Sequence, residues 1–167
     1  EAAPSVRLNL YFTGSLLEYA AKNRPGFLER LSGLWREDRV EVLGGAFHDP
    51  ILPSIPDRDS LGQLQYTANF YKRSLGQLPS GAWLCLRAWS PGLIRTLARA
   101  GCKYTLLDDA QFAVAGVPTA DLRGHWATEW LGRAMSIFPI DSRLSGALSV
   151  GGAEGLRRAV EERPSAS

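Results

Sequence analysis

Polar and aromatic side chains gather where apolar, strand-like stretches of the sequence end. These positions are His48-Asp49, Arg87 to Trp89, Asp108-Asp109 and His125 to Glu129. Such side chains can bind ligands or move protons, and in parallel α/β sheets and barrels the ligand site lies at the carboxyl ends of the strands. We therefore expect any functional site of this chain to lie at that edge of its sheet.

The neighbouring carboxylates Asp108 and Asp109 are of the type used for acid/base chemistry or metal binding. Adjacent carboxylates repel each other, and this repulsion can raise the pKa of one of them. Consecutive residues of a strand point to opposite faces, so we expect only one of the two to face the site. Asp49 precedes Pro50 and fits either a site carboxylate or a turn former.

The sequence has no pattern typical of a bound metal or cofactor. Cys85 and Cys102 are isolated from one another, and the two histidines stand at distant positions, so no zinc-ligand spacing is present. Gly44-Gly45 and Gly151-Gly152 lack the context of a phosphate-binding loop. We expect neither a metal nor a cofactor.

Five strand-like stretches position the polar residues. They are Val6 to Phe12, Val40 to Leu43, Ala82 to Leu86, Lys103 to Leu107 and Ala134 to Phe138. Helical patterns with one apolar face separate the first four of them. Alternation of strand and helix implies parallel neighbours joined by right-handed connections, so the fold class is α/β.

Composition and charge are those of an ordinary globular domain. The 167 residues include 19 Lys and Arg against 17 Asp and Glu, with 45% hydrophobic residues. The arginines are scattered, so no nucleic-acid partner is expected, and no apolar run approaches the roughly 20 residues that span a bilayer. Isolated cysteines favour a reducing, cytoplasmic setting, unless a secretory segment has been removed. We expect one domain over residues 1–160 and a flexible tail at 161–167.

The segments around the strand ends resemble those of glycoside hydrolase family 57, especially its 4-α-glucanotransferases and α-amylases. The resemblance is carried, in the family's order, by FTGSLLEY, VEVLGGAFHDPILPSIPDRDSLGQ, GAWLCLRAWSPGL, AGCKYTLLDDAQF and MSIFPIDSRL. It implies a (β/α)7 barrel and retaining chemistry on α-glucans, with a Glu nucleophile and an Asp acid/base. We therefore expect a partial (β/α)7 barrel with about five mostly parallel strands and helices on the outside.

The resemblance also places the nucleophile. The family carries it in a segment of the form W-L-x-E-R-x-W, and in Trp83 to Trp89 the Glu position is held by Leu86. A leucine side chain has no lone pair with which to attack an anomeric carbon. The family's His-Gln-Pro strand and its Asp-Gly-Glu-Lys-Phe segment have no counterpart in this sequence. We expect no catalytic residue in it.

Other positions match residues that line or support the family's sugar site. They are His48, Asp49, Trp83, Arg87, Trp89, Asp108 and Asp109. The two indole rings suit the apolar faces of sugars, or belong to the core. His48 is either a partner for a sugar hydroxyl or a plain surface group. Arg87 would orient a nucleophile carboxylate, and without one it needs another anion or a path to solvent.

Three functions are compatible with this pattern. The first, which we favour, is a non-catalytic family 57-like module that binds α-glucan or is structural. The second is an active α-glucan enzyme completed by another chain or by recruited carboxylates, namely Asp49 or Asp109. The third is an assembly subunit of a larger complex. Because a partial barrel leaves strand edges open, we expect a homo-oligomer or a subunit of a complex.

Overall fold

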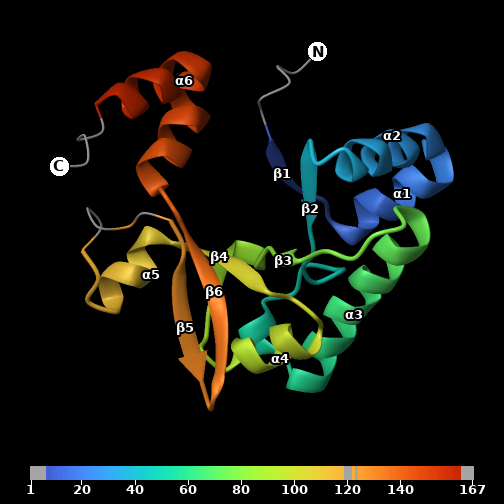
Figure 1. Ribbon diagram of the computed structural model, residues 1–167, viewed down its shortest axis with the longest axis horizontal. Helices are drawn as coiled ribbons and strands as arrows, with labels where there is room; N and C mark the ends of the chain where they lie inside the picture. Colours follow the sequence, from blue (N-terminus) through green and yellow to red (C-terminus); the bar gives the residue numbers. More distant parts are fainter. Residues whose placement is uncertain (1–6, 119–121, 123, 163–167) are drawn as a thin grey trace. The chain divides into compact units, whose positions relative to one another are not determined.

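The computed structural model describes residues 7–118, 122 and 124–162, which fall into two compact units (Figure 1). The first unit contains the chain up to Leu106 together with Trp126–Ile137. The second contains Leu107–His125 and the chain from Phe138 onward. The units interleave in sequence, because β4 and β6 each begin in the first unit and end in the second.

Parallel strands form the centre of the first unit. β1 (Leu8–Tyr11) pairs in parallel with β2 (Val40–Leu43), so that Tyr11 lies opposite Leu43. A parallel bridge from Gly44 to Ala82 continues this pairing to β3 (Gly81–Ala82), which pairs in parallel with β4 (Tyr104–Asp108). The carboxyl ends of these strands therefore lie at one edge.

The third strand is shorter than predicted. The sequence pattern indicated a strand from Ala82 to Leu86, but β3 ends at Ala82, and Cys85–Arg87 forms a short 3-10 turn. The reason is conformational, because Leu86 and Arg87 both adopt positive φ, which is incompatible with an extended strand.

The segment from His125 to Glu129, which we expected to follow a strand, instead contains one. β5 (Trp126–Trp130) and β6 (Arg133–Ile140) form an antiparallel hairpin, and the strand order in this sheet is β3-β4-β6-β5. Leu131 and Gly132 between them both have positive φ, as a tight two-residue hairpin turn requires.

Among its described residues, the first unit contains four α-helices. They are α1 (Gly14–Asn23), α2 (Pro25–Arg36), α3 (Asp57–Ser74) and α4 (Leu93–Arg99). Thr13 caps α1, and Pro25 begins α2 with the fixed φ that suits a first helical turn. α2 packs on β2, and α3 packs against α4 (Figure 1). The core that α1, α2, β2 and α3 share consists of buried residues that include Leu17, Leu31, Val42, Phe47, Phe70 and Tyr71.

The second unit contains α5 (Asp109–Val114) and the longer α6 (Ser142–Glu161). Asp141 caps α6 by accepting a hydrogen bond from the Leu144 backbone nitrogen at 2.9 Å. Gly152, with φ of 58°, interrupts the helical backbone of α6. The predicted tail begins at the last residue of this helix, and residues 163–167 lie outside the described part.

The observed architecture is a mixed α/β fold with mostly parallel strands, in agreement with the predicted class. The strands of the described residues do not close into a barrel. No described helix is both long and apolar enough to pass through a bilayer.

Candidate functional site

The carboxyl ends of β1 and β2 bring Tyr11 and Asp49 together. The Oη of Tyr11 donates a hydrogen bond to Oδ1 of Asp49 and lies 3.4 Å from the carbonyl oxygen of Ala46. Asp49 has a φ of 50°, a left-handed conformation that Asp tolerates better than most residues. Asp49 is thus a turn residue, and its carboxylate is held at the strand ends by Tyr11 of β1.

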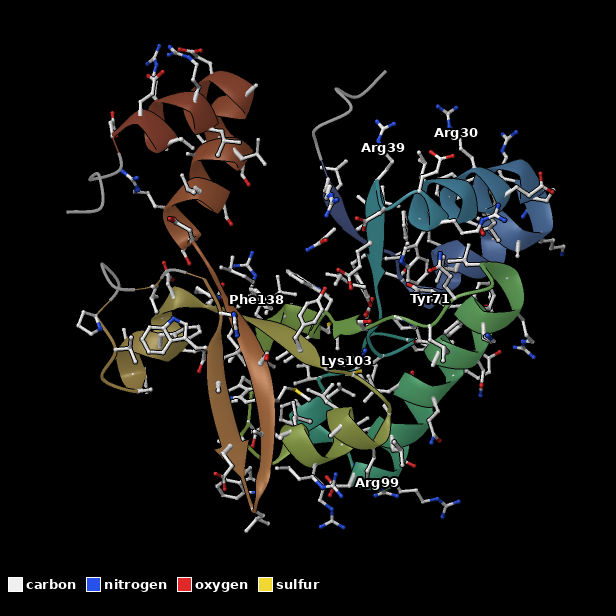
Figure 2. All side chains as sticks on the ribbon, viewed as in Figure 1. Arg30, Arg39, Tyr71, Arg99, Lys103 and Phe138 are labelled. Carbon is white, nitrogen blue, oxygen red and sulfur yellow. The ribbon has the colours of Figure 1, made fainter. Side chains whose placement is uncertain are left out.

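Two tyrosine hydroxyls at this edge remain protonated. Burial, followed by the hydrogen bond to Asp49 and the charge of that carboxylate, raises the pKa of Tyr11 far above its ordinary value. Burial and the charge of Asp49 likewise raise the pKa of Tyr71, whose Oη donates to the carbonyl oxygen of Leu43 at 3.0 Å. Figure 2 shows Tyr71 beside β2. Both phenols therefore act as donors and not as bases.

Trp83 and Arg87 extend this group of side chains. The ring of Trp83 lies 6.1 Å from that of Tyr11, tilted by 32°. The guanidinium carbon of Arg87 lies 5.8 Å from the centroid of a Trp83 ring, a cation–π contact. We call Tyr11, Asp49, Trp83 and Arg87 the strand-end cluster.

A glycine permits this close approach. A Cβ atom on Gly45 would lie 2.8 Å from the carbonyl oxygen of Trp83 and 2.9 Å from the ring of Tyr11. Both distances are shorter than van der Waals contact, so a side chain at this position would push the two aromatic residues apart. The Gly44-Gly45 pair after β2 therefore serves packing at the strand ends.

The turn after Leu84 contains Leu86, the residue that the sequence resemblance predicts to stand at a nucleophile position. Leu84 is buried, and its carbonyl oxygen accepts from the Arg87 backbone nitrogen at 2.9 Å. Leu86 (φ 51°, ψ 16°) and Arg87 (φ 54°) are both in the left-handed region. The Leu86 side chain is 78% exposed. Left-handed backbone costs an L-residue about 1–2 kcal/mol, and such strain concentrates at functional sites.

Cys85 shows that the charge of Asp49 reaches this turn. Burial, and then the negative charge of Asp49, raises the pKa of the Cys85 thiol, while a backbone hydrogen bond at Leu86 lowers it less. The thiol is therefore kept in its less reactive protonated form. Asp49 and the turn at Leu86 belong to one electrostatic environment.

His48 directly precedes Asp49 of the cluster, and Trp89 follows Arg87 two residues later. The His48 ring is exposed and stacks on Tyr66 of α3, with 6.4 Å between the centroids and 30° between the planes. Its backbone nitrogen donates to Gln63 Oε1 at 2.9 Å. Trp89 is half-buried and follows the turn, just before the chain enters α4.

Asp108 and Asp109 belong to the second unit, where they begin α5. Asp109 accepts hydrogen bonds from Ser142 Oγ at 2.7 Å, from the Ser142 backbone nitrogen at 3.1 Å and from the Ala110 nitrogen at 2.8 Å. Its carboxylate thus fixes the first residue of α6. Within the described ranges, no three or more His, Cys, Asp or Glu side chains gather as a metal site would require.

Sequence reasoning missed Tyr11 and Tyr66. Tyr11 is the last residue of β1, and an aromatic residue at a strand's carboxyl end was a usable signal. Tyr66 lies on α3, and no local pattern distinguishes it from other exposed helix residues. The tertiary contacts with Phe47, at 4.3 Å between ring centroids, and with His48, at 6.4 Å, connect it to the strand ends.

The fold and the site define an α/β protein whose polar and aromatic residues converge at the carboxyl ends of parallel strands. Residues 1–162 match glycosyl hydrolase family 57, and the chain belongs to this family.

Several characterised relatives are similar over most of this chain. Alpha-amylase 1 of Dictyoglomus thermophilum is 36% identical over 141 residues, 84% of this chain and 21% of that protein. The 4-alpha-glucanotransferase of Thermococcus litoralis is 35% identical over 144 residues, 86% of this chain and 22% of that protein. The crystal structure of the 4-alpha-glucanotransferase from Thermococcus litoralis superposes with a TM-score of 0.85 and 32% identity, covering 95% of this chain and 25% of that one. The chain thus spans about a fifth to a quarter of the length of these relatives.

Proposed function

We propose that this chain is part of a family 57 (β/α)7 barrel and binds an α-glucan at its strand ends without cleaving it. The observation that carries the proposal is the turn at Leu86, which combines left-handed backbone with an exposed apolar side chain. This strained geometry suits a residue that must be presented to a ligand. The residue presented here has no nucleophilic atom.

Retaining glycoside hydrolysis through an enzyme nucleophile requires two carboxyl groups about 5–5.5 Å apart, one of which attacks the sugar. Leu86 can neither attack an anomeric carbon nor stabilise the positive charge of the transition state. Asp49 lies close enough to influence Cys85, but its Oδ1 accepts the hydrogen bond of Tyr11. That bond uses one oxygen of the carboxylate to hold the strand ends together, and the other oxygen can accept from a ligand.

The same residues can contact a sugar. The indole of Trp83, with Trp89 nearby in sequence, offers an apolar surface for the face of a sugar ring. Asp49 and Arg87 offer an acceptor and donors for its hydroxyl groups. We further propose that His48 contributes a hydroxyl contact.

A calorimetric titration with maltoheptaose tests the proposal. We expect a dissociation constant in the millimolar range, equivalent to about 4 kcal/mol, because hydroxyl contacts only replace those with water. Trp89→Ala together with Asp49→Asn is expected to abolish binding. The Asn variant keeps an acceptor for Tyr11, so the fold is expected to survive.

Trp130→Ala is the matched control, because Trp130 is 44% exposed and lies at the hairpin end of β5. It removes an exposed indole that lies away from the strand ends and is expected to leave binding unchanged. Equal binding by the unmodified chain and the double variant would refute this placement of the site.

An active α-glucan enzyme is the second candidate. It is favoured by the charge of Asp49, which after burial is the second cause of the raised pKa of the Cys85 thiol, next to Leu86. In this case Asp49, or a group from another chain, would act as the nucleophile in place of Leu86. Turnover of maltoheptaose distinguishes the two candidates.

We also propose that the chain associates with a second copy or with another subunit. Large apolar side chains are well exposed on β1, α1 and α2, including Leu8 at 46%, Leu16 at 49%, Tyr19 at 56% and Phe27 at 44%. Burying them would stabilise an assembly by roughly 25 cal/mol per Å². Light scattering on the purified chain tests this, and a monodisperse monomer of 18.2 kDa would contradict it.

A further inference from the structure

The outer face of α3 carries a hollow that the strand-end cluster does not use. It has a volume of about 370 Å³ and is lined by Tyr66, Asn69, Lys72 and Arg73. These positions follow one another at helical spacing, so their side chains share a face of the helix. The volume lies within the roughly 300–1,000 Å³ typical of small-ligand sites.

The hollow is cationic. Lys72 and Arg73 line it, and no carboxylate does. The acidic residues of α3, Asp57 and Asp59, stand in its first turn, at the opposite end of the helix. The C-terminal end of a helix contributes about half a negative charge, which the two full positive charges exceed. A compact anion is therefore favoured here.

An aromatic ring forms the other wall of the hollow. Tyr66 is 46% exposed, although its ring is held in place on two sides. The buried Phe47 meets it edge to face at 4.3 Å between centroids, and His48 stacks against it at 6.4 Å. A ring that is fixed and partly exposed can cover the apolar face of a sugar without further loss of side-chain freedom.

We propose that this hollow binds a sugar unit that carries a phosphate group. The ring of Tyr66 covers the sugar face, and the Asn69 amide bonds a hydroxyl group. Lys72 and Arg73 neutralise the phosphate, the guanidinium as a two-pronged donor and the ammonium as a point charge. The proposal concerns a second site and does not depend on glucan binding at the strand ends.

An NMR titration of the ¹⁵N-labelled chain tests the proposal with three probes, namely glucose 6-phosphate, glucose and inorganic phosphate. We expect glucose 6-phosphate to move the amide signals around Tyr66, Asn69, Lys72 and Arg73, with an affinity at least about tenfold above that of either other probe. Lys72→Met combined with Arg73→Met is expected to weaken glucose 6-phosphate binding by at least about tenfold.

Arg95→Met combined with Arg99→Met is the matched control. Both arginines are exposed residues of α4, and Figure 2 shows Arg99 directed away from the rest of the molecule. This variant removes the same charge from another surface and is expected to bind glucose 6-phosphate normally. Equal losses in the two double variants would mean that net charge, and not the hollow, attracts the phosphate, which would overturn the proposal.

The aromatic wall is tested separately. Tyr66→Phe keeps the ring and is expected to retain binding, whereas Tyr66→Ala is expected to lose it, with thermal melting confirming that both variants fold. Equal affinity for inorganic phosphate and glucose 6-phosphate would overturn the role of the sugar. Maltoheptaose binding elsewhere on the chain, with these four signals unmoved, is compatible with the proposal, so the two sites succeed or fail independently.

Discussion

Leu86 combines two features that rarely occur together in a stable turn. Its φ of 51° is strained for a residue with a branched apolar side chain, and 78% of that side chain faces water. Neither feature stabilises the fold. The conformation of this turn is therefore set by the residues around Leu86 and not by the preference of Leu86 itself. Such a conformation is typical of a loop that presents a side chain to a ligand.

Replacing Leu86 by Asn is expected to stabilise the chain. Asn adopts left-handed backbone more readily than Leu, so the free energy of unfolding should rise by about 0.5–1 kcal/mol. Leu78→Asn is the control, because Leu78 is also exposed, at 57%, but is not among the positive-φ residues. Urea denaturation measures both variants, and equal changes would show that exposure alone, without strain, explains the effect.

At the scale of elements, α3 is fixed to β2 through Tyr71. This side chain is fully buried, and its hydroxyl donates to the Leu43 carbonyl at the end of β2. The bond satisfies the carbonyl of Leu43 at the end of β2. The next residue, Gly44, forms the bridge to β3. The position of the strand-end cluster thus depends on a helix that contributes no residue to it.

Stability is expected to fall at high pH because of Tyr71. An unfolded phenol loses its proton from about pH 10, while burial keeps the folded phenol protonated, so the unfolded state gains stability as pH rises. This group alone contributes a slope of up to about 1.4 kcal/mol per pH unit above pH 10. Tyr71→Phe should reduce that slope, at a cost near neutral pH of about 1 kcal/mol for the lost hydrogen bond.

Urea denaturation between pH 8 and pH 11 measures this effect. Burial also raises the pKa of Tyr11, and it raises that of the Cys102 thiol to about 11, so some loss of stability with rising pH should remain in Tyr71→Phe. Tyr19→Phe serves as the control, since Tyr19 is 56% exposed. An unchanged slope in Tyr71→Phe would contradict the role assigned to the buried phenol.

Gly45 is expected to be intolerant of any side chain. Gly45→Ala places a methyl group against the Trp83 carbonyl and the Tyr11 ring, and should destabilise the fold by roughly 1–3 kcal/mol. Gly62→Ala is the contrasting variant, because Gly62 lies within α3 with no atom near its would-be Cβ. It should stabilise by about 0.5–1 kcal/mol. Thermal melting compares the two, and similar melting temperatures would refute the packing role of Gly45.

The sequence predicted the strands with strong apolar runs and missed the features set by tertiary contacts. β2 was found with its observed bounds, because VEVL is followed directly by two glycines. The end of β3 at Ala82 could not be predicted, because residues with high strand propensity, Trp83 and Leu84, continue the pattern into a turn. Asp49 was recognised from its position after a strand, but its partner Tyr11 is revealed only by the pairing of β1 with β2.

At the scale of the whole molecule, the chain is a family 57 protein that spans about a fifth of its curated relatives. It has parallel strands with the carboxylate of Asp49 at their ends, and we propose that Leu86 stands at the nucleophile position. The proposed function therefore separates two properties that the family's enzymes combine, namely recognition of an α-glucan and cleavage of its bonds.

Product analysis after long incubation of the purified chain with maltoheptaose tests this separation most directly. Because a residue without a lone pair cannot form the glycosyl-enzyme intermediate, we expect neither shorter hydrolysis products nor longer transfer products above an enzyme-free control. Products that accumulate with chain concentration would contradict the account and would show that a carboxylate elsewhere acts as the nucleophile.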